Sequence, residues 1–131
     1  GTAFGGVIMS WIDICSSIAA KRHCGRVCVT ARVDALEFKA PIKVGDVVSL
    51  TARLNAAFNT SMEIAVRVEV EHAVTGARSL CADARATFVN LGDDGKPCPV
   101  PPLLTQNEDE HRVAAQAAER RERRRAAKRA S

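Results

Sequence analysis

The chain has 131 residues, 47% of them hydrophobic, and a formal net charge of +4. This length suffices for one domain with a single apolar core. The chain has no run of 18 or more apolar residues and no secretory signal pattern at its start. We therefore expect a cytoplasmic protein with no membrane partner. The basic excess lies in residues 108–131, which carry 8 basic and 5 acidic side chains, against 11 and 10 in residues 1–107.

The five cysteines indicate a reducing compartment, because their number is odd and no CxxC pair occurs. His23, Cys24 and Cys28 come nearest to the spacing of metal ligands. Buried apolar thiols are the simpler interpretation of this group. We expect neither a metal site nor a bound cofactor.

Residues 5–21 are predicted to form a helix, because apolar residues recur at spacings of three and four. The stripe expected to face the core consists of Ile8, Trp11, Ile12, Cys15, Ile18 and Ala19. The opposite side carries small or uncharged residues, with Asp13 as its only carboxylate. We therefore expect this helix to be nearly enveloped by protein.

Four strands are predicted after the helix. Alternation is clearest in residues 62–70, where charged residues occupy a face expected to be in water. Residues 27–38 alternate and then slip in phase, which predicts a β-bulge near Ala35. The other two strands are expected at 48–54 and 82–88. One long helix followed by an antiparallel meander predicts an α+β fold in which the sheet wraps the helix.

The C-terminal segment changes character at residues 97–102, whose prolines exclude a central strand. From Glu108 the sequence is acidic first and then rich in arginine, which suits the polarity of a helix dipole. We predict a domain at 1–104 and a charged helical tail at 105–131, solvated and frayed at its end. The tail lacks interleaved aromatic residues and its charges are mixed, so we expect no nucleic-acid partner.

Asp13 is the candidate catalytic residue. A carboxylate on an enclosed helix is unfavourable unless it is hydrogen-bonded or used in chemistry. A structural aspartate, bonded to a backbone amide or a nearby serine, is the alternative interpretation. Gly5 and Gly6 open the helix without side chains and leave backbone N–H groups accessible to a carbonyl or an anion. Donor and carboxylate would act on one substrate only if that substrate bridged them.

Four segments together resemble the hot-dog acyl-coenzyme A thioesterases of the YciA and brain acyl-CoA hydrolase type. They are FGGVIMSWID (4–13), VTARVDALEF (29–38), PIKVGDVV (41–48) and FNTSMEIAVRVE (58–69). The resemblance covers most of residues 1–104, and PPLLT and AERRERRR in the tail extend it. It implies a hot-dog fold, with a long central helix wrapped by an antiparallel sheet. The strand that precedes this helix in the family is expected to be absent here.

The resemblance implies hydrolysis of fatty acyl-CoA to free fatty acid and coenzyme A. Asp13 would be general base or nucleophile, and the amides of Gly5 and Gly6 would stabilise the oxyanion. No cofactor is required, because coenzyme A is part of the substrate and product. The resemblance also implies coenzyme A contacts at two segments: Ala31, Arg32 and Val33, and Thr60, Ser61 and Met62. From the residues alone, Thr60 and Ser61 are equally well strand-capping hydroxyls, and Arg32 is a solvated arginine.

Assembly and alternative functions follow from the same comparison. Animal members of the family commonly pair two hot-dog domains in one chain, whereas this chain has one. The smallest assembly expected is therefore a homodimer. The family resemblance further implies a homohexamer built from three such dimers. A non-catalytic acyl-CoA sensor is the main alternative, although a pure binder gains nothing from a carboxylate near the thioester. A hot-dog dehydratase would need a catalytic histidine, and His23 lies in a polar turn after the helix.

Overall fold

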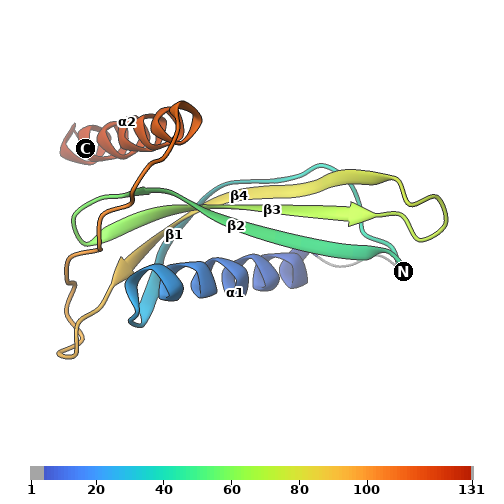
Figure 1. Ribbon diagram of the computed structural model, residues 1–131, viewed down its shortest axis with the longest axis horizontal. Coiled ribbons are helices and arrows are strands. Elements are labelled where there is room, and N and C mark those ends of the chain that lie inside the picture. Colours follow the sequence, from blue (N-terminus) through green and yellow to red (C-terminus); the bar gives the residue numbers. More distant parts are fainter. Residues whose placement is uncertain (1–4, 131) are drawn as a thin grey trace.

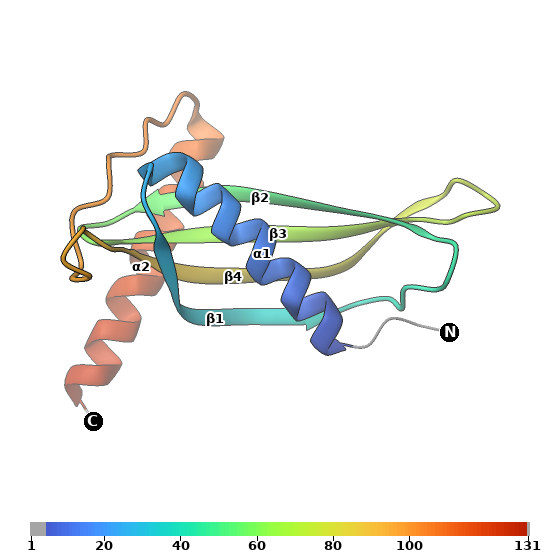
Figure 2. The same cartoon turned by 90° about the horizontal axis from the view of Figure 1, so that it is seen from below.

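The computed structural model describes residues 5–130, apart from the side chain of residue 35, and consists of a four-stranded sheet with a helix on each face (Figure 1). The elements are α1 (Gly5–Cys24), β1 (Cys28–Phe38), β2 (Val47–Ala57), β3 (Ser61–Glu71), β4 (Arg78–Asn90) and α2 (Glu108–Ala130). The strands pair antiparallel in the order β1-β4-β3-β2. Figure 2 shows α1 crossing one face of the sheet obliquely, with β1 and β2 at the two edges. The predicted α+β fold is confirmed.

The core lies between α1 and the inner face of the sheet. Alternate residues of the two central strands are buried there because successive side chains of a strand point to opposite faces. They pack against Ile8 and Ile12 of α1, and the buried strand residues are Met62, Ile64, Val66, Val68, Val70, Ala82, Ala84, Ala86 and Phe88. The alternation predicted for both strands is therefore confirmed.

The edge strand β1 is irregular in two places. Its pairing with β4 shifts in register between Thr30 and Arg32, and again between Asp34 and Glu37. The second shift confirms the bulge predicted near residue 35. The first was not predicted, because phase in a strand is read from apolar residues and Thr30 and Arg32 are polar.

The buried face of α1 differs from the predicted stripe. Ile18, expected in the core, is 48% exposed, whereas Ser16, expected on the open side, is fully buried. The hydroxyl of Ser16 donates a 2.6 Å hydrogen bond to the carbonyl of Ile12, which satisfies the group inside the core. In the single chain α1 is not enveloped, since Ile14 is also exposed. The helix ends at Cys24, and Gly25 after it has a φ of +67°, a left-handed conformation that suits glycine.

Residues 97–102 lead from the sheet to α2. Val100 is buried, and its backbone N–H donates to the carbonyl of Asn59 at 2.8 Å. Asn107 caps α2 by accepting a 2.8 Å hydrogen bond from the N–H of Glu110, so the helix begins at Glu108 as predicted. Within residues 5–130, no helix combines the length and apolar character needed to cross a bilayer.

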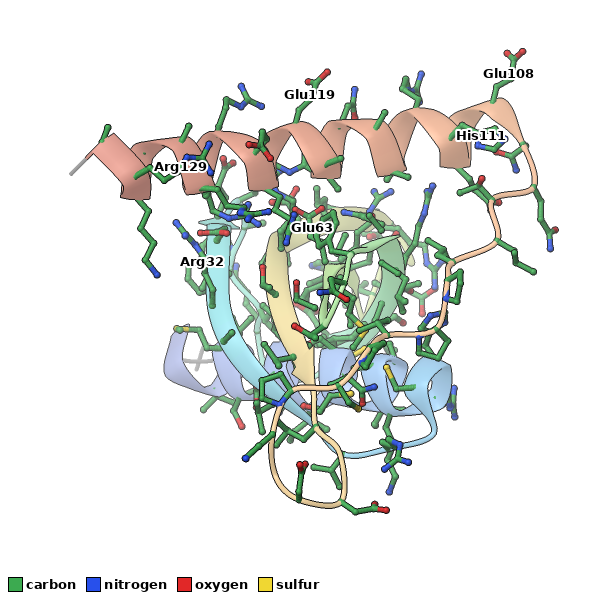
Figure 3. The ribbon with its side chains drawn as sticks, turned by 90° about the vertical axis from the view of Figure 1, so that its left-hand side faces the viewer. Arg32, Glu63, Glu108, His111, Glu119 and Arg129 are labelled. Atoms are coloured by element: carbon green, nitrogen blue, oxygen red, sulfur yellow. The ribbon has the colours of Figure 1, made fainter. Side chains whose placement is uncertain are left out.

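Most of α2 is exposed to solvent, as predicted, but one face of the helix packs on the sheet, which was not predicted. Figure 3 shows α2 lying across the outer face of the sheet, with Glu63 of β3 beneath it. Ala117 of α2 is fully buried, and Glu63 is only 2% exposed although it lies on the face expected to be in water. The small side chain of Ala117 lets α2 approach the sheet closely, and Arg120 of the same helix binds the carboxylate of Glu63.

Candidate active site

Asp13 lies on the side of α1 that faces the edge strand β1. Its Oδ1 accepts a 2.7 Å hydrogen bond from the hydroxyl of Thr30 on β1. The side chain of Asp13 is exposed in the single chain. The prediction of an enclosed carboxylate is therefore wrong for the single chain. The partner is also not the backbone amide or serine considered from the sequence. The carboxylate is therefore held in one orientation while it remains open to a reactant.

The surface next to Asp13 is apolar. A small cavity beside it, with about 20 Å³ of free space, is lined by Met9, Ile12, Asp13, Ser16, Val33, Leu36 and Ala86. This space suffices for about one water molecule and for no acyl chain. Met9 and Val33 are nevertheless 47% and 42% exposed, and Val29 of β1 is exposed to the same extent as Val33. An acyl chain would therefore have to lie on this surface, not inside one chain.

Gly5 and Gly6 form the first turn of α1, where backbone N–H groups have no carbonyl partner within the helix. Gly6 precedes Asp13 by seven residues, which places it about 10 Å away along the helix axis. One chain therefore does not bring these amides and the carboxylate to the same thioester carbonyl. The roles of Gly5 and Gly6 stay predictions.

The residues expected to contact coenzyme A fall into two places. Ala31, Arg32 and Val33 are all exposed on β1, and Arg32 forms a 2.6 Å ion pair with Asp34. Thr60 and Ser61 lie at the turn into β3. Their carbonyls accept hydrogen bonds from the N–H groups of Asn90, at 3.0 Å, and Phe58, at 2.8 Å.

Met62 is the exception among these residues, because its side chain is fully buried in the core. Its backbone is covered as well, because β3 is paired with β2 on one side and with β4 on the other. The remaining contact assignments are compatible with the exposure of the residues and stay predictions.

A second polar cluster lies under α2 and was not predicted. Arg120 of α2 binds Glu63 through two hydrogen bonds, Nε to Oε1 at 3.0 Å and Nη2 to Oε2 at 2.7 Å. The side-chain amide of Asn55 donates to Oε2 at 2.8 Å. Burial alone raises the pKa of Glu63, but the hydrogen bonds from Arg120 and Asn55, with the charges of Arg120 and Arg85, hold it below its ordinary value. The carboxylate is therefore ionised and anchors α2.

The histidine and cysteines considered as metal ligands have other roles in the structure. The Nε2 atom of His23 lies 2.7 Å from the carbonyl oxygen of Pro101, in the segment that leads to α2. Burial, with contributions from Cys28 and Cys98, raises the pKa of the Cys24 thiol to about 12. A thiol with this pKa is protonated at neutral pH and is a poor ligand or nucleophile. In the described part of the chain, no group of three or more His, Cys, Asp or Glu residues is arranged to hold a metal ion.

Comparison with known proteins identifies the family of this chain. The sequence profile of the thioesterase superfamily matches residues 1–77. A Bacillus subtilis protein named an uncharacterized acyl-CoA thioester hydrolase is 44% identical over 126 residues, which are 94% of this chain and 73% of the relative. The chain belongs to the thioesterase superfamily.

Other relatives of this thioesterase-superfamily chain are longer. The rat cytosolic acyl coenzyme A thioester hydrolase is 41% identical over 112 residues, which are 84% of this chain but 29% of the relative. The chain thus spans less than a third of that protein.

Solved structures agree with the family assignment. A structure described as an apo-hexameric acyl-CoA thioesterase has a TM-score of 0.90 and 37% identity, covering 100% of this chain and 83% of that one. A Staphylococcus aureus acyl-CoA hydrolase in complex with butyryl coenzyme A has a TM-score of 0.85 and 36% identity, covering 97% and 77%. The predicted hot-dog fold and membership of a thioester hydrolase family are confirmed.

Proposed function

We propose that the chain hydrolyses fatty acyl-CoA to free fatty acid and coenzyme A in the cytoplasm, with Asp13 as the catalytic carboxylate. The observation that supports this role is the placement of Asp13, an exposed carboxylate oriented by Thr30 and bordered by exposed apolar side chains. A thioester needs both a base and an apolar surface for its acyl chain. The names of the relatives support the substrate class.

The chemistry requires one carboxylate and hydrogen-bond donors to the carbonyl oxygen. As a base, Asp13 takes a proton from water, whose oxygen attacks the thioester carbon. The C–O bond forms, the C–S bond breaks, and the sulfur of coenzyme A leaves and takes the proton that Asp13 removed from water. As a nucleophile, Asp13 would itself form the new C–O bond, and water would then open the resulting anhydride. In both routes the amides of Gly5 and Gly6 stabilise the oxyanion.

A second copy of the chain completes the proposed site. Within one chain the first turn of α1 is too far from Asp13, and Met9, Val29 and Val33 leave apolar surface uncovered beside it. Among residues 5–130, no strand pairs with the outer side of the edge strand β1. A two-fold homodimer joined at this face covers the apolar residues and brings the first turn of one α1 toward Asp13 of the other. Three such dimers would form a hexamer, as the description of one similar structure indicates for that protein.

Met9→Lys is expected to separate the proposed dimer and abolish hydrolysis together with it. Met9 is 47% exposed in the single chain and would be covered in the dimer, so a lysine there would place a charge in an apolar interface, with the carboxylate of Asp13 one helical turn away. Light scattering after gel filtration measures the mass. Val74→Lys is the control, because Val74 is 89% exposed in the connection between β3 and β4. A Met9→Lys protein with the mass of the wild-type assembly would contradict this interface.

Thr30→Val is expected to lower kcat by about tenfold or more with little change in KM, because a hydrogen bond to a charged group typically contributes about 1.5–3 kcal/mol. Thr30 is a positioning residue, since its hydroxyl holds the Asp13 carboxylate. Thr30→Ser retains the hydroxyl and should recover most of the rate. If the valine and serine variants lose the same activity, the hydroxyl has no such role.

Release of free thiol from acyl-CoA esters of increasing chain length tests the proposed activity. Saturable release is expected, and the dependence on chain length identifies the preferred substrates. Calorimetric binding of acyl-CoA without any thiol release would instead support the sensor function and contradict hydrolysis.

A further inference from the structure

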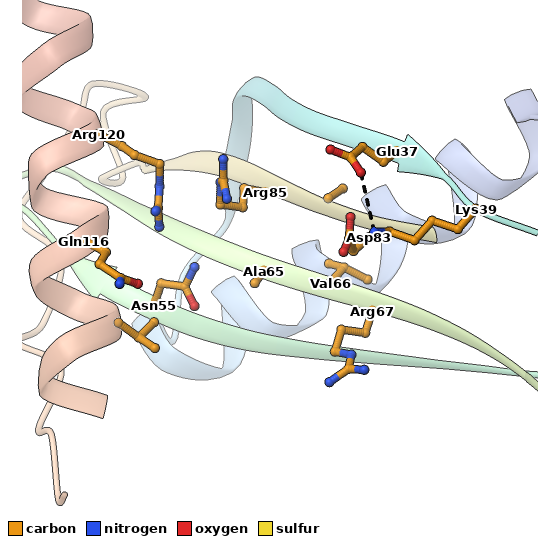
Figure 4. Close-up of a pocket in the computed structure, with 12 residues that line it drawn as sticks. Glu37, Lys39, Asn55, Ala65, Val66, Arg67, Asp83, Arg85, Gln116 and Arg120 are labelled. Atoms are coloured by element: carbon orange, nitrogen blue, oxygen red, sulfur yellow. Dashed lines mark ion pairs between the residues drawn. The ribbon is translucent and has the colours of Figure 1, made fainter. Parts of the chain in front are cut away.

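A groove on the outer face of the sheet lies apart from the proposed thioesterase site. It has a volume of about 430 Å³, within the range of small-molecule sites, and is bounded by β3, β4, the end of β1 and α2. We name it the outer groove; its lining includes Lys39, Asn55, Ala65, Arg67, Arg85 and Arg120 (Figure 4). Figure 1 shows α2 and α1 on opposite faces of the sheet, and Asp13 belongs to α1.

The two ends of the outer groove differ in charge balance. At the end near β1, Glu37 and Lys39 form a 3.5 Å ion pair, and Asp83 faces Arg67 across neighbouring strands. These four charges cancel. At the end under α2, the guanidinium groups of Arg85 and Arg120 both act on the single carboxylate of Glu63. Asp34 of β1 lies opposite Arg85 in the strand pairing, but its carboxylate is already paired with Arg32 at 2.6 Å and lies 3.9 Å from Arg124. Positive charge is therefore in excess over negative charge at that end.

Arg85 carries this excess charge. Both hydrogen bonds of the Arg120 guanidinium go to Glu63, so that carboxylate is occupied. The Nε atom of Arg85 is buried and has no hydrogen-bond acceptor among the described residues. A buried donor without an acceptor is unfavourable and commonly marks the place of a bound ion or water. The neighbouring floor residue is Ala65, whose small side chain leaves room above the strand.

From this geometry we propose that the outer groove binds a small oxyanion, a phosphate or carboxylate group, on Arg85. The planar guanidinium matches both kinds of oxyanion through paired hydrogen bonds. Gln116 of α2 lines the same groove and offers its side-chain amide to the rest of the ligand. The site is independent of the thioester chemistry proposed for Asp13.

Calorimetric titration with inorganic phosphate and, separately, with succinate tests the site at low ionic strength. Saturable binding of at least one anion is expected, and the one that binds more tightly identifies the ligand class. Arg85→Gln should weaken this binding at least about tenfold, because it removes a charged pair of donors. Arg78→Gln is the matched control, since Arg78 lies on the same strand with a side chain 62% exposed and outside the groove. Arg78→Gln should bind the anions with wild-type affinity.

Two further variants separate loss of the site from loss of the fold. Ala65→Leu fills the floor of the outer groove without changing its charge and should also weaken binding, whereas Arg85→Lys retains the charge and should retain part of the affinity. Thermal unfolding of each variant monitors the fold, and thiol release should stay at the wild-type rate in Arg85→Gln. Wild-type affinity in a folded Arg85→Gln, or no saturable binding of either anion to the wild type, would overturn the proposal.

Discussion

Asp13→Asn is expected to lower kcat for acyl-CoA hydrolysis by a factor of about 10²–10⁴, the usual contribution of a general acid or base. The amide oxygen of asparagine can still accept the hydrogen bond from Thr30, so the geometry of the site is retained. The amide neither removes a proton from water nor attacks the thioester. Because Asp13 is exposed and hydrogen-bonded through one oxygen, the fold and the affinity for coenzyme A should change little. Steady-state thiol release and calorimetric binding measure the two effects.

Asp93→Asn is the control for this substitution. Asp93 is an exposed carboxylate whose 2.8 Å ion pair with Arg26 lies on the surface. Removing it should leave kcat unchanged, since exposed ion pairs contribute little. An Asp13→Asn protein with wild-type turnover would remove Asp13 from the catalytic role, whatever the behaviour of the control.

Glu63→Gln is expected to destabilise the protein by about 3 kcal/mol or more, the lower end of the effect of removing one partner of a buried ion pair. The glutamine is nearly isosteric, but Arg120 would lose the charge that holds it, and Arg85 would lose its neighbouring counter-charge. The contacts of α2 with the sheet should weaken. Urea unfolding measures the change, and limited proteolysis after the arginines of α2 reports its release.

Two comparisons sharpen this test. Glu71→Gln removes a partly exposed carboxylate that lies 3.9 Å from Arg78, and should change stability by no more than about 0.5 kcal/mol.

The pH dependence of stability supplies the second comparison. The pKa of Glu63 is lower in the folded protein than its ordinary value of 4.5. The ionised carboxylate therefore contributes its full stabilisation of the fold above pH 4.5, and this stabilisation is lost as the pH falls through the folded pKa. The stability difference between wild type and Glu63→Gln should therefore shrink below about pH 4.5. A constant difference from pH 7 to pH 3 would contradict the charged pair.

The central strands could be predicted because their physics is local. In residues 62–70 apolar and charged side chains alternate, and burial of a single face converts that alternation into a strand with a defined orientation. The same pattern could not reveal that α2 covers part of the polar face. Glu63 resembles Glu69 in the sequence, and the difference in their burial depends on Arg120, 57 residues away.

The position of Asp13 could be predicted, but its surroundings could not. Its isolation among uncharged residues of α1 marked it as unusual, and the family resemblance assigned it a role. Its partner Thr30 lies on the next element, and a bulge directly after Thr30 is not visible in the apolar pattern of β1. Thr30 carried only one signal in the sequence, a hydroxyl within a strand close to the helix.

The sequence by itself determined the hot-dog fold, the strand pattern, the helix that carries Asp13 and the start of the C-terminal helix. These features depend on periodicity, caps and short motifs that operate within a few residues. Only the tertiary structure decided that Asp13 is exposed and hydrogen-bonded to Thr30, and that Met62 belongs to the core. It also decided that Arg120 joins α2 to the sheet beside the outer groove. The reason is that burial and the pairing of charges depend on which distant surfaces meet, and local patterns do not contain that information.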